Sequence, residues 1–255
     1  MNIMKIKDNE NFSKNYQIHI IYNTYDIFEQ NPRVRELLAE NWGMKLRGYK
    51  KYFPYGVLPI DCYDYLCHHI IITNKLTNKV VMGIKSLTYS NCLNCGFNFP
   101  VQSHLFTGNE DIYSKHILAI NEWLQSDTDA AYSSGFTIEP SLSREEKKYL
   151  TDVVFWLFYH FYTTYKIPNI LQAISKRFKL DGRQKDIGFE MLSYQGEVLS
   201  HIVTKEYDNV ESDIMVLNNY NFKKDHIDKA MSIKMLWDNR EEFIGVKGSV
   251  LDKVG

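Results

Sequence analysis

The sequence lacks any long apolar run, and its charges almost cancel. No hydrophobic stretch reaches the roughly 18 residues that a membrane-spanning helix needs. The opening segment, MNIMKIKDNENFSK, has neither the apolar core nor the cleavage site of a signal peptide. The formal net charge is -1, so no overall field attracts nucleic acid or an anionic membrane. These absences predict a cytoplasmic protein without a membrane span or a nucleic-acid partner.

Cysteine is also scarce, with four residues in a chain of 255. The spacing is C-x4-C from Cys62 to Cys67 and C-x2-C from Cys92 to Cys95, and two histidines follow Cys67. Such a set can hold structural zinc, although C-x4-C is looser than the usual zinc knuckle. The alternative is free thiols in a reducing compartment, and we expect no metal site.

The composition is that of a folded protein with one core. Hydrophobic residues make up 44% and charged residues 24%, as in average soluble domains. A chain of 255 residues can bury one α/β core. We therefore expect a single domain, with the core at about 16–205 and a C-terminal extension at about 206–255. The 18 Tyr and 14 Phe suit either an aromatic core or a deep apolar cavity.

Hydrophobic periodicity predicts both strands and helices. β-branched and aromatic runs predict strands at 16–22, 68–73, 79–89, 130–138, 169–175 and 188–192. Helical spacing predicts helices at 33–42, 110–125 and 223–244, and another after the capping box formed by Ser143 and Glu146. The remainder is expected as loops at 44–59 and 91–108 and a basic connecting segment at 176–186. The fold class is α/β, with a mixed, mostly antiparallel sheet, helices on both faces and a C-terminal helical extension.

Four local motifs follow one another within residues 33–192. They are Arg33-Val34-Arg35 with Asn41-Trp42-Gly43, Asp61-Cys62-Tyr63-Asp64, Val80-Val81-Met82-Gly83 with Phe99-Pro100-Val101-Gln102, and Gly135-Phe136-Thr137-Ile138-Glu139-Pro140 with Arg144 and Ile187-Gly188-Phe189. In this order they resemble the autoinducer-synthase and N-acyl amino acid synthase branch of the GNAT acyltransferase superfamily. The resemblance implies a GNAT-like fold without a permanently bound cofactor. It also implies an N-acyltransferase that moves a fatty acyl group from an acyl-carrier-protein or acyl-CoA thioester to the amine of an amino acid or similar small acceptor.

The charged positions of that branch differ in this chain. Ser86 stands where autoinducer synthases have an arginine, and Lys85 is expected on the opposite face of the strand. Tyr132 and Gly135 replace a glutamate and an arginine, and Gln102 replaces another glutamate. Those charges hold a cationic sulfonium substrate in homoserine lactone synthesis. Acyl-homoserine lactone synthesis is therefore one alternative, beside a small-molecule acetyltransferase and a non-catalytic GNAT-like binding module.

The resemblance also suggests where the reaction occurs. Asp61 and Asp64 are candidates for a base acting through water or for holding the acceptor's ammonium group, although paired aspartates also cap turns. Tyr132 is a candidate proton donor to the leaving sulfur, or else a packed strand residue. GNAT sheets hold the thioester between two splayed parallel strands, here expected at 130–138 and 169–175. The acyl and thioester contacts are then expected from Trp42, Ser134, Gly135, Phe136 and Ile138.

The carrier is expected at the start of the helix that follows residue 140, where free N–H groups favour phosphate. The usual glycine-rich loop is absent there, which favours acyl carrier protein over CoA. An acidic carrier protein would meet a basic surface, or this surface is only a solvated basic face. The predicted carrier and phosphate contacts are Ser143, Arg144, Lys147, Lys148, Lys176, Arg177 and Arg183.

Overall fold

The computed structural model describes residues 12–53, 60–106, 110–125, 129–204 and 209–245. These residues form two units. The first unit contains the described residues of Met1–Ser86, Gly135–His160 and Asp228–Gly255, and the second those of Leu87–Ser134 and Phe161–Ile227. The strand over 130–138 contributes to both, because the boundary falls between Ser134 and Gly135. The division into one domain with a C-terminal extension stays a prediction.

The sheet of the first unit follows the predicted strands closely. Its order is β11 (Glu241–Ile244), β1 (Tyr16–Tyr22), β2 (His68–Asn74), β3 (Lys79–Thr88) and the end of β4 (Ala130–Ile138). Strands β1 and β2 pair antiparallel, as do β2 and β3 across the predicted hairpin, whereas β11 pairs parallel with β1. The isoleucines of β1 and β2 are almost fully buried, as expected of strands covered on both faces.

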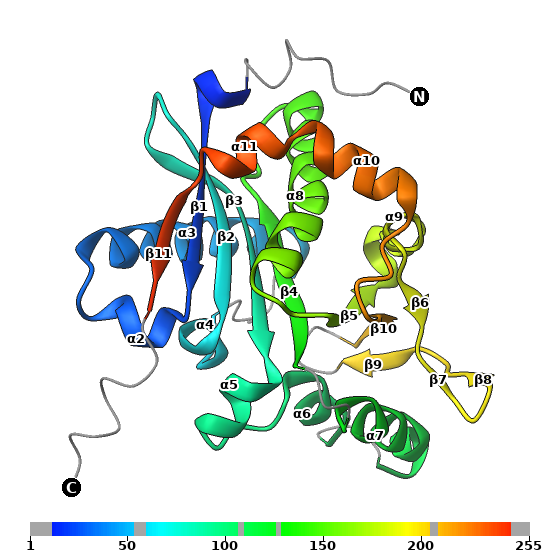
Figure 1. The fold of residues 1–255 in the computed structure, drawn as a ribbon. Coiled ribbons are helices and arrows are strands. Elements are labelled where there is room, and N and C mark those ends of the chain that lie inside the picture. The colour runs from blue at the N-terminus through cyan, green and yellow to red at the C-terminus, as the bar shows by residue number, and fades with distance from the viewer. Residues whose placement is uncertain (1–11, 54–59, 107–109, 126–128, 205–208, 246–255) are drawn as a thin grey trace, which may run out of the picture. The chain divides into compact units, whose positions relative to one another are not determined.

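Helices lie on both faces of this sheet. The helices of the first unit are α2 (Thr24–Phe28), α3 (Pro32–Tyr52), α4 (Tyr63–Leu66), α11 (Lys234–Asp238), most of α8 (Arg144–Thr164) and the second half of α10 (Lys224–Ser232). In Figure 1, α8 lies in front of the strands and α3 behind them. The core beside α3 consists of Ile21, Val34, Leu37, Leu38, Met44, Ile71 and Val80.

Helix α3 begins as predicted but continues much further. The Asn31 side chain accepts hydrogen bonds from the first N–H groups, and Pro32 occupies the first helical position. Gly43 does not end the helix, which runs to Tyr52. A glycine inside a helix costs only about 1 kcal/mol, and burial of the following turns outweighs that cost. The loop predicted at 44–59 is therefore wrong as far as residue 52, and residues 54–59 lie outside the described part.

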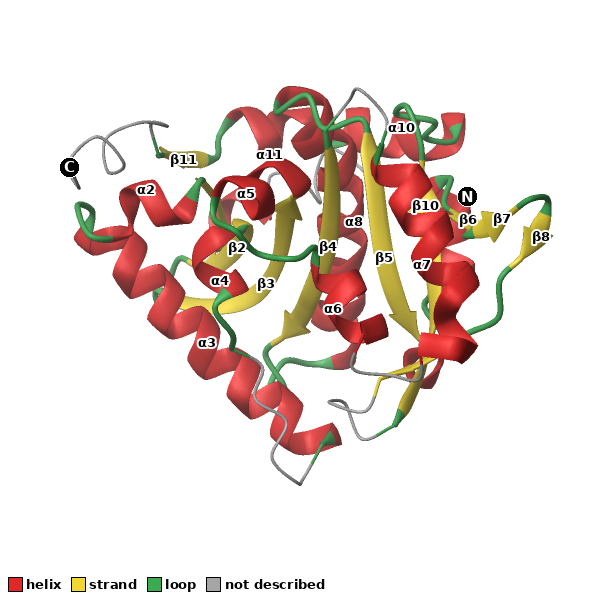
Figure 2. Cartoon of the chain, turned by 90° about the horizontal axis from the view of Figure 1, so that it is seen from below, coloured by secondary structure: helices red, strands yellow, loops and turns green. Residues whose placement is uncertain are grey.

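The second unit contains the start of β4 and the strands that follow it. Its sheet order is β4, β5 (Asn169–Ser175), β10 (Val210–Leu217) and β6 (Glu190–Met191), with β9 (Ile202–Thr204) also paired to β10 and a separate hairpin of β7 (Ser193–Tyr194) and β8 (Glu197–Val198). The first residues of β4 and β5 lie side by side (Figure 2). Their parallel pairing, predicted from the sequence, covers Ala130 to Tyr132 opposite Asn169 to Leu171.

Several short elements of the second unit differ from the predictions. Its helices are α5 (Tyr89–Asn94), α6 (Pro100–Phe106), α7 (Glu110–Leu124), α9 (Asp181–Ile187) and a 3-10 turn at Lys176–Phe178. The loop predicted at 91–108 is wrong, because Thr88 caps α5 through its side chain and α6 follows; residues 107 and 108 lie outside the described part. The strand predicted at 188–192 is reduced to β6, and Gly188 has a positive φ of 127° that interrupts an extended chain.

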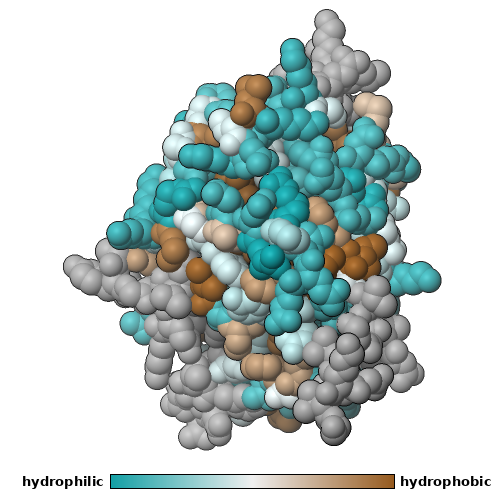
Figure 3. All heavy atoms as spheres, turned by 90° about the vertical axis from the view of Figure 1, so that its left-hand side faces the viewer, coloured by the Kyte–Doolittle hydropathy of each residue, from teal (hydrophilic) through white to brown (hydrophobic). Residues whose placement is uncertain are grey.

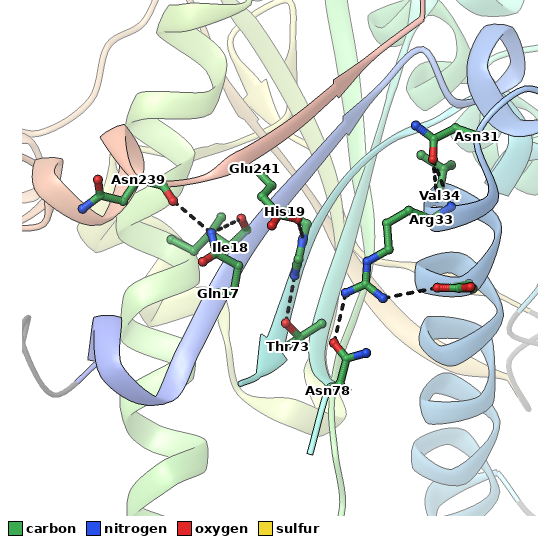
Figure 4. Close-up of polar contacts among 11 residues, drawn as sticks. Gln17, Ile18, His19, Asn31, Arg33, Val34, Thr73, Asn78, Asn239 and Glu241 are labelled. Carbon is green, nitrogen blue, oxygen red and sulfur yellow. Dashed lines mark hydrogen bonds and ion pairs between the residues drawn. The ribbon is translucent and has the colours of Figure 1, made fainter. Parts of the chain in front are cut away.

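The C-terminal segment is helical only in part. Helices α10 and α11 confirm the start of the helix predicted at 223–244, but Glu241–Ile244 forms strand β11. Figure 4 shows how the polar contacts of β1 fix this strand: Gln17 donates to the Asn239 carbonyl at 2.9 Å, and the His19 ring lies 2.9 Å from the Glu241 carboxylate and 2.8 Å from the Thr73 hydroxyl. Edge pairing thus overrides the helical spacing.

The visible surface beside these outer strands is largely hydrophilic. Seen from the left-hand side of Figure 1, the described residues present mostly polar side chains with separate hydrophobic ones between them (Figure 3). Polar residues along an edge strand discourage pairing with other chains. Among the described helices, none is both long and apolar enough to cross a membrane. The α/β class with a mixed, mostly antiparallel sheet is confirmed.

Candidate active site

Two lysines and two aspartates of the first unit form one ionic cluster. The Lys45 ammonium donates to Asp64 Oδ1 at 2.8 Å, and the Lys85 ammonium donates to Asp64 Oδ2 at 2.8 Å and to Asp61 Oδ1 at 3.1 Å. The backbone N–H of Asp61 also donates to Asp64 Oδ2, at 3.1 Å. Three elements meet here, because Lys45 lies on α3, Asp64 on α4 and Lys85 on β3.

Burial separates the roles of the two aspartates. Asp64 is 0% exposed, whereas the Asp61 side chain is 43% exposed. Burial alone would raise the pKa of Asp64, but the ammonium groups of Lys45 and Lys85 outweigh it and hold this pKa well below its usual range. Both Asp64 oxygens accept hydrogen bonds. Asp64 therefore suits a positioning role, and Asp61 is the carboxylate that a solute can reach.

The two lysines differ as well. Burial lowers the pKa of Lys45, and the nearby Lys85 cation adds to this effect against the opposing Asp64 carboxylate. Burial also acts to lower the pKa of Lys85, but the Asp64 and Asp61 carboxylates outweigh it and raise this pKa above the usual value. Lys85 is thus a permanent cation behind Asp61, and Lys45 is the cation that is easier to deprotonate.

Strand β4 reaches the cluster at a glycine. Gly135 has a φ of +66°, which side chains rarely adopt. A Cβ there would lie 3.3 Å from Lys85 Cγ and 3.4 Å from Lys45 Nζ. Close backbone approach therefore depends on this glycine, and the structure brings together three predicted site residues, Asp61, Asp64 and Gly135.

Helix α3 approaches the sheet through two more glycines. A Cβ on Gly48 would lie 2.9 Å from Thr137 Cγ2, and one on Gly83 would overlap the Asn41 amide. Asn41, Lys45 and Gly48 follow one face of α3 at helical spacing. The buried ammonium of Lys45 is thus held at the depth at which the helix touches the strands.

Comparisons with known proteins identify this architecture. The structure is similar to BjaI, a CoA-dependent acyl-homoserine lactone synthase, with a TM-score of 0.52 and 11% identity over 93% of this chain and 96% of that one. LasI, an acyl-homoserine lactone synthase, gives a TM-score of 0.50 and 12% identity over 81% and 89% of the two chains. FeeM, an N-acyl amino acid synthase from uncultured soil microbes, gives 0.47 and 14% over 88% and 94%. The chain has the acyl-homoserine lactone synthase fold. No protein-family model matches the sequence, and no curated protein does.

At the level of the fold, this likeness confirms the resemblance that the four motifs indicated. The motifs also led to one wrong prediction, the orientation of Lys85. Lys85 was expected to face away from the site, but it contacts both aspartates. A bulge at Ile72 and Thr73 shifts the register, because Thr73 pairs with Val80 and Ile72 with Met82. The bulge precedes both residues, so Lys85 and Ser86 still point to opposite faces, and the site lies on the face of Lys85.

Lys45 and His69 were missed by sequence reasoning. Lys45 lies beyond Gly43, where the helix was expected to end; its signal is the spacing from Asn41 to Lys45 to Gly48. His69 donates from Nε2 to the Asp64 carbonyl at 2.8 Å. Burial lowers the pKa of His69 to about 4, with a further contribution from Lys45. The ring is therefore neutral near pH 7 and fixes the turn that carries both aspartates.

Two of the other predicted acyl contacts, Trp42 and Phe136, pack against aromatic rings. Trp42 forms ring contacts with Phe28 and Tyr65, at centroid distances of 6.4 and 5.5 Å. Phe136 stacks on Phe155 at 5.4 Å, in the first unit with Ile138. Ser134 and Tyr132 belong to the second unit, where the buried Tyr132 ring meets Phe99 edge-on at 6.0 Å. Their roles stay predictions.

The predicted carrier contacts divide between the units. In the first unit, Ser143 and Glu146 form the capping box of α8 through hydrogen bonds of 3.2 and 3.0 Å, and Lys147 donates to the Pro140 carbonyl at 2.7 Å. Arg144 and Lys148 are exposed on the same turn. In the second unit, Lys176 contacts His201 at 3.1 Å, with Arg177 and Arg183 on the following turns. The structure leaves the carrier itself a prediction.

The zinc alternative finds no support in the described residues. None of the four cysteines forms a disulfide; Cys67 and Cys92 are buried, and Cys62 and Cys95 are exposed. Burial raises the pKa of both Cys67 and Cys92, so these thiols stay protonated near neutral pH. Within the same residues no three His, Cys, Asp or Glu side chains gather as metal ligands.

Proposed function

We propose that this chain is an N-acyltransferase that transfers a fatty acyl group from a carrier thioester to the amine of an amino acid or similar small acceptor. One observation carries the proposal. An accessible carboxylate, Asp61, accepts a hydrogen bond from Lys85 and donates its backbone N–H to the buried Asp64, at the point where Gly135 brings β4 close. Such a carboxylate can bind an ammonium group and accept its proton, directly or through water.

The reaction requires a neutral amine. Asp61 holds the acceptor's ammonium group until its proton moves to the carboxylate or to water. The amine nitrogen then attacks the thioester carbonyl, the C–N bond forms, and the C–S bond breaks. The leaving thiolate takes a proton, for which Tyr132 is the candidate donor. Asp64 and Lys85 position Asp61 and do not themselves react.

The donor is proposed to meet β4 and β5 beyond their paired residues. Backbone N–H groups of a strand can hold a carbonyl oxygen while it gains negative charge. The start of α8, with exposed Arg144 and Lys148, is suited to a phosphate. BjaI is a CoA-dependent enzyme, whereas the absent glycine loop favours acyl carrier protein, so both donors belong in the test.

The charges of the site favour a zwitterionic acceptor over a sulfonium. Lys45 and Lys85 balance Asp61 and Asp64, so the cluster has no net negative charge to attract a cationic substrate. An amino acid places its ammonium group on Asp61 and is itself neutral overall. Homoserine lactone synthesis remains the alternative, and the acceptor panel tests it.

The test is acyl transfer by the purified protein. Acyl-carrier-protein and acyl-CoA donors of several lengths are incubated with amino acids, simple amines and S-adenosylmethionine, and thiol release and the acylated product are measured by mass spectrometry. Asp61→Asn is expected to lower kcat/KM about 100-fold or more, the range of general-base catalysis. Asp186→Asn, at an exposed position of α9, is the control that should retain activity. If no pair of donor and acceptor gives thiol release, the proposal is refuted. Binding of a donor without thiol release would point to the non-catalytic module.

A further inference from the structure

Two buried polar atoms of the second unit lie just beyond the paired residues of β4 and β5. Ser133 follows Tyr132, and Gln172 follows Leu171, the last residues paired between these strands. Ser133 is 4% exposed and Gln172 is 2% exposed. Within the described part of the chain, Ser133 Oγ and Gln172 Oε1 have no hydrogen-bond partner.

The strand register relates these two side chains. Residues opposite one another in a sheet point to the same face, and neighbours along a strand alternate. Ser133 and Gln172 each lie one position beyond a paired residue, so both point to the face away from Tyr132 and Leu171. Tyr132 therefore points to one face of the strands, and Ser133 and Gln172 point to the other.

The chemistry of the two atoms defines the missing partner. A carboxamide oxygen accepts hydrogen bonds only, and a serine hydroxyl can accept or donate. A buried acceptor without a donor is unfavourable, and folded proteins contain few of them. Two such atoms on neighbouring strands, which are proposed to hold the thioester, indicate a ligand that supplies a hydrogen-bond donor.

We propose, on the basis of the N-acyltransferase function above, that Ser133 and Gln172 form a polar subsite for a hydrogen-bond donor carried by an extended acyl thioester. That donor is either an amide N–H of the carrier arm or a hydroxyl group on the acyl chain. A site built to bind such a group discriminates against a ligand that lacks it, because its buried polar atoms are then left unpaired. The subsite thus selects the donor substrate.

The experiment compares Ser133→Ala and Gln172→Met with a matched control. Gln184→Met removes another glutamine that is 1% exposed and has an unpartnered Oε1, but on helix α9. For each protein kcat/KM is measured with a saturated acyl carrier thioester, its 3-hydroxyacyl counterpart, and a saturated thioester of a simple alkyl thiol. For the donor that carries the bound group, kcat/KM of each strand variant should fall about tenfold, the value of one buried hydrogen bond. The kcat/KM of the control should not change.

The pattern of loss identifies the group. If the group is a hydroxyl, the variants lose kcat/KM only with the 3-hydroxyacyl donor. If it is a carrier amide, they lose kcat/KM with both carrier thioesters and keep it with the alkyl thioester. Unchanged kcat/KM of both variants for every donor would overturn the proposal while leaving the N-acyltransferase function intact. Absence of transfer by the unmodified protein would instead remove the proposed function. The melting temperature distinguishes a ligand subsite from a structural role. Without ligand, Ser133→Ala and Gln172→Met should melt at or above the temperature of the unmodified protein, and a clear drop in both would count against the subsite.

Discussion

The buried Asp64 should make Lys45 a main determinant of stability. In Lys45→Met the apolar stem is largely retained, but a carboxylate that is 0% exposed loses one of its two cations. Removing one partner of a buried ion pair costs about 3–5 kcal/mol. Lys85 and the Asp61 N–H continue to stabilise the carboxylate, so we expect a loss near the lower end, about 3 kcal/mol. For a chain of this length that corresponds to a melting temperature lower by roughly 10 °C.

Urea unfolding, followed by tryptophan fluorescence and far-UV circular dichroism, gives the free energy of unfolding. Lys50→Met is the matched control, because Lys50 is exposed on the same helix and should change stability by less than about 0.5 kcal/mol. The acid range supplies a second check. The pKa of Asp64 is lower in the folded state, so its stabilisation is present above the unfolded pKa and is lost as pH falls. The difference between parent and Lys45→Met should therefore shrink below pH of about 4. Equal stability of the two lysine variants at pH 7 would refute the ionic role.

Two further predictions concern neighbouring residues. Gly135→Ala puts a side chain at a φ of +66° and against both lysines, so we expect a loss of at least about 1 kcal/mol in stability and a larger loss of acyl transfer, measured by thermal unfolding and by kcat/KM. The pKa of His69 is about 4 when folded and 6.5 otherwise, so the unfolded state binds the proton first and stability falls as pH drops below 6.5. The loss at pH 4 should be about 3 kcal/mol. Urea titrations of the parent between pH 7 and 4 would show this slope, and His69→Gln should flatten it; an unchanged slope would contradict the assignment.

Strong local patterns were sufficient for much of the sheet. Strands β1, β4 and β5 have the predicted bounds, because alternating or continuous β-branched runs end at clear breaks. The capping box likewise located the start of α8. Strand β10 was missed since Glu211, Ser212 and Asp213 interrupt its apolar pattern, although it occupies the middle of its sheet. Strand β11 was read as helix, because parallel pairing with β1 is a long-range interaction that no local spacing reports.

In the site, as in the sheet, local motifs could be recognised and long-range contacts could not. Asp61 and Asp64 came from a short motif, and Gly135 from another, so each could be recognised locally. The lysines that organise them come from α3 and β3, and their meeting depends on where the helix ends and on which face of β3 turns toward it. Both are decided by packing across the sheet. The order of motifs therefore indicated the fold, but not the charge balance within it.

The glycines at the contact between α3 and the sheet have a consequence for how the site can change. Gly48 touches no charged group, yet it sets how deeply the helix sits on Thr137. A methyl group there would lift the helix and draw Lys45 away from its carboxylate without altering any residue of the cluster. The position of the Asp61 carboxylate is therefore sensitive to a change of one carbon atom at this contact, and natural variation there would adjust the site while leaving its motifs intact.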